Sequence, residues 1–275
     1  MLGSGAKLGV AGADQRLSKG EGVQMLSSRV PVALAAALLA SACQVQQTAI
    51  RKDLSKESER PLPHRVLLAE PDIRVHEISA GELVEEVREW SQKASGEAVK
   101  SVAGLAQSSG MFEVVQPSRL SDAERGALDQ YASLYALVSG SAYAAQHSMY
   151  GAWQKRAAEF DYTLGPGMDS IGKNTKLDAV VFVVGTDYIS SASRKAAMAL
   201  GMALGVLTGR YLGPESKPAF LSAGIVDMHT GELLWYSTEL RSGSDDLRDP
   251  AVVKSLVEDL FKTYPGAPKP SDAKK

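Results

Sequence analysis

Apolar and polar residues divide the chain into polar segments, one short apolar segment and a long region with regular patterns. In residues 64–264 the apolar positions recur with the periods of strands and helices, which predicts one folded domain. We expect strands at residues 64–69, 112–115, 178–187, 219–227 and 232–240, and helices at 79–108, from 121 to 143 or beyond, at 193–210 and at 249–261. Residues 73–78, which follow the first strand, alternate in polarity. The order β-α-β-α-β-(α)-β-β-α predicts an α/β (α+β) sandwich, a single mixed sheet with helices on its faces.

The strongest predicted strand covers residues 178–187. Its continuous apolar run indicates burial on both faces, and therefore a central position in the sheet. Residues 219–227 and 232–240 alternate in polarity and flank His229-Thr230-Gly231. This arrangement predicts a hairpin whose glycine takes the positive φ that the turn needs.

Capping signals mark several helix ends. Ser79 with Glu82, and Ser121 with Glu124, have the spacing of a capping box at a helix start. Gly110 follows the first long helical pattern and is expected to end that helix.

The short apolar segment lies close to the only cysteine. A segment beginning at Met25 carries Arg29, continues through the apolar run 30–39, and ends in small residues up to Ala42, directly before Cys43. This arrangement resembles the signal peptide (residues 25–42) and lipobox of bacterial lipoproteins. The resemblance implies cleavage between Ala42 and Cys43 and a covalent lipid on Cys43, which would anchor the protein stably in a membrane.

Other structures for residues 30–43 fit the sequence less well than a lipoprotein signal. The apolar run is too short for a permanent transmembrane helix, which takes about 20 residues. A buried core helix normally has a polar face, and residues 30–39 have none. A lone cysteine can also be an ordinary buried thiol. The segment departs from the commonest lipobox in having Ala40 where leucine is usual.

The first residues do not fit a signal peptide. Residues 1–24 are polar and glycine-rich, and they place the apolar segment far from the terminus. We therefore expect translation to begin at Met25, or residues 1–24 to be disordered. Residues 19–22 would be encoded by purine-rich codons, as expected of a ribosome-binding site read as protein.

Two further segments look unstructured. Residues 43–63 are polar and charged without an apolar stripe, which predicts a flexible tether after the lipidated cysteine. Gln44 is not the aspartate that resembles an inner-membrane retention signal, which favours the periplasmic face of the outer membrane. Residues 265–275 are rich in proline and lysine and are predicted to be a disordered tail.

Composition narrows the possible chemistry. The net charge of −2 and the 23% of charged residues give no electrostatic reason to expect nucleic acid as a partner. With Cys43 lipidated, no thiol remains for a disulfide or a metal site. The four histidines lie far apart, without metal-ligand spacing, and no catalytic motif is present. We expect no metal and no cofactor apart from the lipid, and no enzymatic activity.

Two groups of residues are candidate binding sites. Asp187 and Tyr188 end the predicted central strand, where α/β proteins place ligands. Gly201, Gly205 and Gly209 repeat every four residues along one face of a predicted helix, so another backbone can approach that face closely. The favoured partner of the glycine face is the protein's own sheet, with oligomerisation or insertion into a membrane surface as alternatives.

Three pieces of the chain carry a further resemblance. They are residues 66–68, residues 178–185, and the hairpin 226–235 with its Asp-x-x-Thr-Gly-x-x-x-Trp pattern. In this order they resemble the periplasmic domain shared by the amino-terminal part of the translocation protein TolB, the curli secretion lipoprotein, and the lipoprotein activators of penicillin-binding proteins. That fold includes pore subunits, enzyme activators and docking modules, so the resemblance implies a fold rather than one function. Residues 146–176 and 193–210 depart from the shortest versions.

The function expected from these patterns is a non-catalytic envelope assembly or docking factor. It would be anchored to the membrane by lipid and would bind an envelope protein partner through a sheet edge or the glycine helix. The alternatives are an oligomeric secretion or pore component, an envelope enzyme of unknown chemistry, and a stress-surveillance lipoprotein that depends on tether length.

Overall fold

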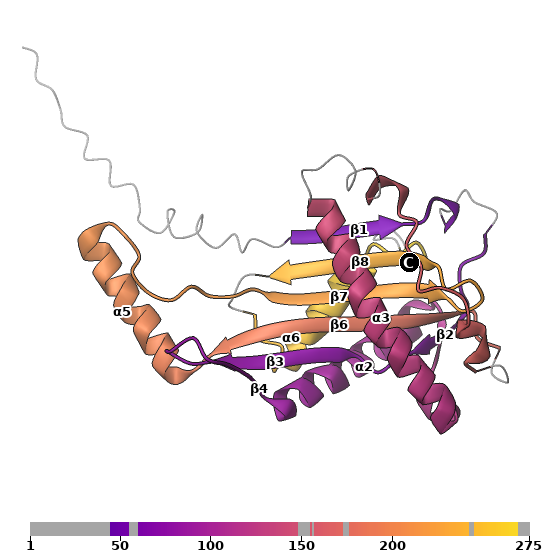
Figure 1. Ribbon diagram of the computed structural model, residues 1–275, viewed down its shortest axis with the longest axis horizontal. Coiled ribbons are helices and arrows are strands. Elements are labelled where there is room, and N and C mark those ends of the chain that lie inside the picture. The colour runs from indigo at the N-terminus through magenta and orange to yellow at the C-terminus, as the bar shows by residue number, and fades with distance from the viewer. Residues whose placement is uncertain are drawn as a thin grey trace, which may run out of the picture. The chain divides into compact units, whose positions relative to one another are not determined.

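The computed structural model describes residues 45–54, 60–147, 155, 157–172, 176–241 and 245–268. They contain one eight-stranded mixed sheet with helices on both faces (Figure 1), which confirms the predicted α/β sandwich. The strands are β1 (Val45–Ile50), β2 (Arg65–Leu68), β3 (Asp72–Ile78), β4 (Val84–Glu86), β5 (Glu113–Val115), β6 (Ala179–Ser190), β7 (Ala219–Asp227) and β8 (Leu233–Arg241). The α-helices are α2 (Arg88–Ser109), α3 (Asp122–His147), α5 (Ala192–Thr208) and α6 (Pro250–Phe261). Residues 1–24, the predicted signal peptide and Cys43 lie outside the described residues.

β6 is the central strand, as predicted. It pairs antiparallel with β7 on one side and parallel with both β2 and β3 on the other. β2 pairs with residues 179–181 of β6, and β3 pairs with residues 184–190 further along the same side. The interruption between β2 and β3 contains Pro71, which has no N–H to donate to a ladder. β5 extends the sheet beside β2, and β4 extends it beside β3.

The core has one layer on each face of the sheet. α3 crosses one face, and α2 and α6 cover the other (Figure 1). Successive residues of β6 alternate between the layers, so that Val181 packs on the α2 and α6 side and Phe182 on the α3 side. The Tyr135 ring of α3 stacks on the Phe182 ring with centroids 5.2 Å apart.

The predicted β7–β8 hairpin is confirmed, including its glycine. Gly231 has a φ of 72°. A Cβ atom there would come within 1.9 Å of the Gly165 carbonyl oxygen, so the site excludes any side chain. Asp227 Oδ1 accepts hydrogen bonds from the backbone N–H groups of His229 and Thr230, each at 2.8 Å, and these bonds fix the turn.

One capping prediction is confirmed and the other is wrong. The Ser121 N–H donates to Glu124 Oε2 at 2.8 Å, and the Glu124 N–H donates to Ser121 Oγ at 3.3 Å, which together form the capping box at the start of α3. Ser79 and Glu82 instead lie in the turn between β3 and β4, where the Leu83 N–H donates to Ser79 Oγ at 3.1 Å. The first long helix therefore begins only at Arg88, and it ends before Gly110 as expected.

A tertiary contact explains why Ser79 and Glu82 do not form a helix cap. Glu82 takes a φ of 63°, which is outside the helical region. Its carboxylate pairs with the guanidinium of Arg194 at the base of α5. This distant contact favours a turn where the local sequence favours a helix start.

The prediction of a flexible tether is wrong for residues 45–54, which pack on the domain. Within the segment 43–63, β1 pairs antiparallel with β8, from Val45 opposite Leu240 onward. Leu54 is buried in the core. An edge strand is held mainly by the backbone hydrogen bonds of its ladder, so it does not require the apolar stripe that the prediction looked for.

Arg60 adds a side-chain link between this segment and the hairpin. Its guanidinium lies 2.7 Å from Asp227 Oδ2, 2.9 Å from Asp53 Oδ2 and 3.2 Å from Glu232 Oε2. Burial would raise the pKa of Asp227, but the hydrogen bonds from the Thr230 N–H and from Arg60 hold that pKa below its usual value. The ionised carboxylate is therefore part of the folded arrangement.

Two further predicted segments are partly described. Residues 265–268 of the predicted disordered tail form turns, with Ala267 packed against the core, and residues 269–275 lie outside the description. Within the insertion 146–176, Phe160, Tyr162 and Met168 are buried in the layer on the α3 side. No helix in the described parts of the chain is long and apolar enough to cross a membrane.

Candidate functional site

Asp187 and Tyr188 lie near the carboxyl end of β6, as the sequence predicted, but they do not share one site. Neighbouring residues of a strand point to opposite faces of the sheet. The Asp187 side chain is buried on the α2 and α6 side, whereas Tyr188 is half-buried on the α3 side. The two side chains therefore lie in different environments.

Asp187 organises the loop that leads into α6. Its Oδ2 atom accepts a hydrogen bond from the Leu247 N–H at 2.9 Å, and Oδ1 accepts one from the Tyr188 N–H at 2.7 Å. Burial raises the pKa of Asp187, and the charge of Asp246 acts in the same direction, whereas the two hydrogen bonds oppose them. The contacts of Asp187 give this carboxylate a structural role.

Tyr188 forms a cluster with two basic side chains. Its ring stacks on the ring of His76, the residue opposite it on β3, with centroids 5.1 Å apart and planes at 19°. Lys217 Nζ lies 4.7 Å from the centroid of the Tyr188 ring, which is cation–π distance. Tyrosine is one of the residue types enriched among the side chains that contribute most to binding at protein interfaces.

This cluster belongs to a part of the sheet that α3 leaves open. Phe182 lies beneath α3 and is buried, but Val184, Thr186 and Tyr188 on the same face of β6 are only partly buried. Parallel strand pairs are normally covered on both faces. We call this surface the open sheet face and define it by residues Arg74, His76, Val184, Thr186 and Tyr188. Phe220 marks its border, because its ring packs against Tyr143 of α3.

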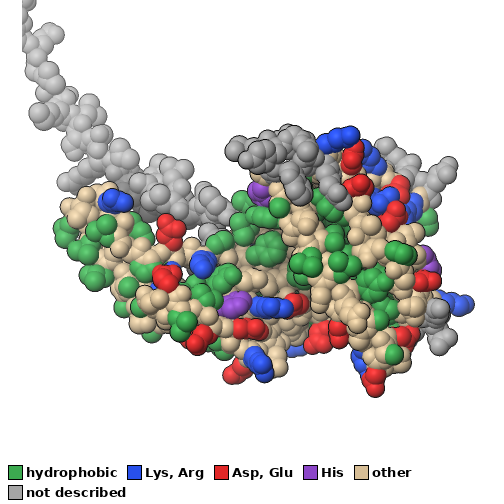
Figure 2. All heavy atoms as spheres, viewed as in Figure 1, with side chains coloured by type: hydrophobic (Ala, Val, Ile, Leu, Met, Phe, Trp, Pro, Cys, Tyr) green, Lys and Arg blue, Asp and Glu red, His purple; other side chains and the backbone are tan. Residues whose placement is uncertain are grey.

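A groove runs along the open sheet face beside α3. Its volume is about 310 Å³, and small residues of α3, among them Ala136 and Gly140, form one wall. The opposite side is formed by Thr186 of β6 and by Arg74 of β3. Figure 2 shows the face that α3 covers, with hydrophobic side chains gathered over its middle.

The glycine face of α5 packs against the segment that follows the helix and not against the sheet. A Cβ atom on Gly201 would lie 2.4 Å from the Gly213 Cα atom, and one on Gly205 would lie 3.3 Å from the Arg210 carbonyl oxygen. Gly209 ends the helix with a φ of 72°. The prediction that this face packs on the sheet is therefore wrong, because the segment 210–213 folds back along it.

The other side of α5 is apolar and exposed. Val206 is 87% exposed and Leu207 is 81% exposed. We define the apolar surface of α5 by Leu200, Met202, Leu204, Val206 and Leu207, all of which are exposed. Figure 1 shows α5 projecting beyond the ends of β3, β6 and β7, and Figure 2 shows the hydrophobic side chains that it carries.

A buried arginine fixes the base of α5. Arg194 is 2% exposed, pairs with Glu82, and donates from Nη2 to the Glu215 carbonyl oxygen at 2.9 Å. The helix is therefore joined both to the β3–β4 turn and to the segment that returns to β7. The sequence places two charged residues, Arg194 and Lys195, in the first turn of an otherwise apolar helix, but it does not indicate which of them is buried.

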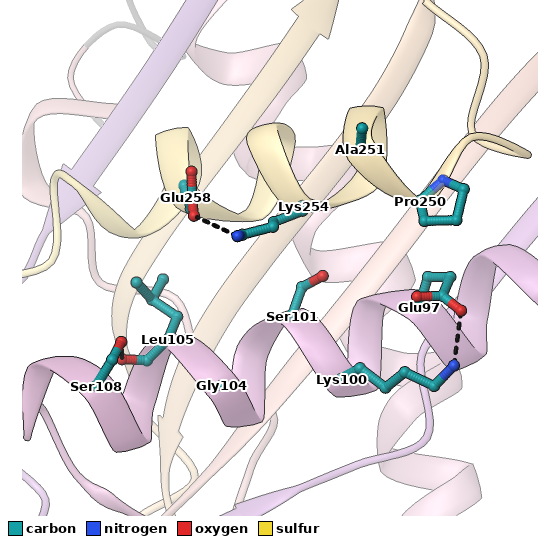
Figure 3. A pocket seen from close by; sticks show the side chains of 10 residues that line it. All are labelled: Glu97, Lys100, Ser101, Gly104, Leu105, Ser108, Pro250, Ala251, Lys254 and Glu258. Carbon is teal, nitrogen blue, oxygen red and sulfur yellow. Dashed lines mark hydrogen bonds and ion pairs between the residues drawn. The ribbon is translucent and has the colours of Figure 1, made fainter.

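A larger groove of about 550 Å³ lies between α2 and α6 (Figure 3). Small residues, including Ser101, Gly104 and Ala251, keep it open. Its charged side chains form ion pairs within each helix. Lys100 Nζ lies 2.7 Å from Glu97 Oε1 on α2, and Lys254 Nζ lies 3.9 Å from Glu258 Oε1 on α6. Among the residues that the structure describes, no three His, Cys, Asp or Glu side chains are placed to hold a metal ion.

Comparison with known proteins gives distant structural neighbours only. No protein-family model and no curated protein matches this sequence. The structure of the PelC dodecamer from Paraburkholderia phytofirmans is similar with a TM-score of 0.34 and 10% identity, covering 82% of this chain and 99% of that one. A dodecamer of a PelC variant from the same organism gives a TM-score of 0.35 with the same identity and coverage. Both scores are below 0.5, so the fold assignment depends on the sheet and helices described above.

Proposed function

We propose that this protein is a lipid-anchored docking factor of the bacterial cell envelope, which binds a protein partner and catalyses no reaction. The lipobox-like segment ending at Cys43 supports the anchor, and Gln44 supports the periplasmic face of the outer membrane as its location. The proposed docking role is based on one observation, the exposure of the open sheet face. On that face Thr186 and Tyr188 of a parallel strand pair remain partly exposed.

The chemistry of the open sheet face suits a protein surface. Tyr188 offers a large amphipathic ring with the cationic group of Lys217 over it, and the exposed Arg74–Asp72 ion pair lies on the neighbouring strand β3. Aromatic residues and arginine are enriched at the centres of protein interfaces. The groove beside α3 gives a partner side chain a place to enter.

Site-specific photo-crosslinking in cells tests this proposal. A photoreactive amino acid is placed at Thr186 on the open sheet face and, as the matched control, at Lys100 on α2. We expect one discrete crosslink to a different envelope protein from position 186 and none from position 100. The Cys43→Ser variant, which lacks the anchor, should lose that crosslink.

Two outcomes would contradict the proposal. Crosslinks between two copies of this chain at position 186 would favour the oligomeric secretion or pore component. Equal crosslinking from positions 186 and 100 would show that the open sheet face has no selective partner.

A further inference from the structure

No described part of the chain covers the apolar surface of α5. A helix that is hydrophobic around most of its circumference is normally buried in a protein core or in a membrane. In α5 the glycine side is covered by the segment 210–213, and the opposite side carries the exposed apolar residues, led by Val206 and Leu207. These side chains require an apolar environment outside the domain.

The charges around α5 favour a lipid surface. The sequence contains no Asp or Glu between Asp187 and Glu215, and Lys195 and Arg210 are exposed at the two ends of the helix. Asp245 and Asp246 line the same pocket as Lys195, so Arg210 is the cation that lies away from acidic side chains of that pocket. Cationic residues beside an apolar helical surface match the anionic headgroups of a bilayer.

The register of the sheet places the start of the described chain at the same end of the sheet as α5. Val45 of β1 lies opposite Leu240 of β8, Leu240 lies opposite Phe220 of β7, and Phe220 lies opposite Thr186 of β6. Three strand spacings separate Val45 from Thr186, which is about 14 Å. β6 ends at Ser190 and α5 begins at Ala192, so the helix leaves the sheet at the end where β1 begins (Figure 1).

Chain length ties the predicted anchor to the same end of the sheet. Only Gln44 separates Cys43 from Val45, so the Cα atoms of Cys43 and Val45 are at most about 8 Å apart. A lipid on Cys43 therefore holds this end of the sheet close to the bilayer. The flexible tether expected from the sequence would have allowed the domain to stand far from the membrane.

From these observations we infer that α5 inserts its apolar surface into the headgroup and upper acyl region of the bilayer that holds the Cys43 lipid. At 17 residues the helix is about 26 Å long, which suits shallow insertion. The lipid and the helix would then form two contacts that fix the orientation of the domain and leave the open sheet face directed along or away from the membrane. The inference rests on the proposed lipidation of Cys43 for this orientation.

The single cysteine makes a direct test possible. In the mature lipoprotein the Cys43 thiol is blocked by lipid, so the cysteine of a Val206→Cys variant is its only free thiol. This variant is labelled with an environment-sensitive dye and reconstituted into vesicles of phosphatidylethanolamine and phosphatidylglycerol. The matched control is Leu137→Cys on α3, because Leu137 is also an exposed apolar residue, 72% exposed, but lies away from α5.

We expect blue-shifted emission at position 206 and quenching by nitroxide-labelled lipids several-fold stronger than at position 137. Adding Leu207→Asp to the labelled Val206→Cys protein should reduce lipid quenching to the level of the control. Quenching of the dye at position 206 by aqueous iodide alone would overturn the inference. Pyrene excimers at position 206 without quenching by lipid would also overturn it, and would show that α5 binds a second copy of the chain. Labelling of Cys43 by the dye would show that this residue carries no lipid, and the proposed anchor would then be wrong. An unlabelled Cys43 without lipid quenching at position 206 would contradict only the insertion of α5.

Discussion

Gly201 lies directly against Gly213, because a Cβ atom on Gly201 would come 2.4 Å from the Gly213 Cα atom. No real side chain tolerates that distance, so α5 and its return segment pack through a contact between two backbones. The regular glycine spacing therefore serves a contact only twelve residues away in the sequence.

Replacing Gly201 with alanine should open this contact. We expect faster hydrogen exchange in residues 192–213 and little change in the thermal midpoint of the domain, because few contacts join α5 to the sheet. Peptide-resolved hydrogen exchange measures the effect. The control is Gly104→Ala on α2, where a Cβ atom meets nothing within 4 Å. That substitution should stabilise the protein by up to about 1 kcal/mol. Unchanged exchange in Gly201→Ala would contradict the prediction.

Replacing Arg60 with alanine should weaken the attachment of the segment before β2. The substitution removes the ion pairs to Asp227 and Asp53, and we expect the free energy of unfolding to fall by about 1 kcal/mol. Urea denaturation measures the change. Arg74→Ala is the control, because Arg74 pairs with Asp72 at the exposed surface and should contribute little. Equal losses in both variants would argue against a special role for Arg60.

Asp187 should make stability depend on pH. Burial raises its pKa in the folded protein above the ordinary value of 3.8, so the folded state holds the proton more tightly than the unfolded state. Its contribution to stability is therefore fully present below pH 3.8 and is lost as the pH rises through the raised folded-state pKa.

Asp187→Asn should remove this dependence. The comparison is the urea midpoint of the two proteins at several pH values between 3.8 and neutrality. The stability of the wild type relative to Asp187→Asn should decline as the pH rises. Asp227 has a lowered pKa and acts in the opposite direction in both proteins, so it cancels in the difference. A difference that is constant with pH would rule out titration of Asp187.

Replacing Tyr135 with phenylalanine should cost about 1 kcal/mol of stability, because it leaves the buried Ser222 hydroxyl without this hydrogen bond. The two hydroxyl oxygens lie 3.3 Å apart beneath α3. Thermal or urea denaturation measures the loss. Tyr131→Phe on the same helix is the matched control, since its hydroxyl donates to the Pro166 carbonyl at a solvent-exposed position and its removal should cost less.

The sequence predicted the elements whose stability is local or comes from continuous apolar runs. β6 was recognisable because five successive residues, 179–183, are apolar and buried. The capping box of α3 and the turn at Gly231 were recognisable because their bonding partners lie within four residues.

The errors concern residues whose partners are distant in sequence. β1 is polar, and its partner β8 lies about 190 residues later, so periodicity gave no signal for it. Glu82 leaves the helical conformation where it meets Arg194. Asp187 and Tyr188 were predicted as one candidate site, although neighbouring residues of a strand point to opposite faces. The sequence shows the alternation along a strand but not the position of the helix that covers it. That alternation could not predict that α3 ends its cover before Thr186, because helix placement depends on the whole core.

The pairing of β1 with β8 also determines how the protein bears mechanical load. A pull on residue 44 along the strand enters the sheet at Val45 and is shared by all six residue pairs of the β1–β8 ladder. Such a load shears the ladder as a unit instead of opening it one pair at a time. With the proposed lipid on Cys43, this geometry would hold the domain at the membrane against a force applied through a bound partner.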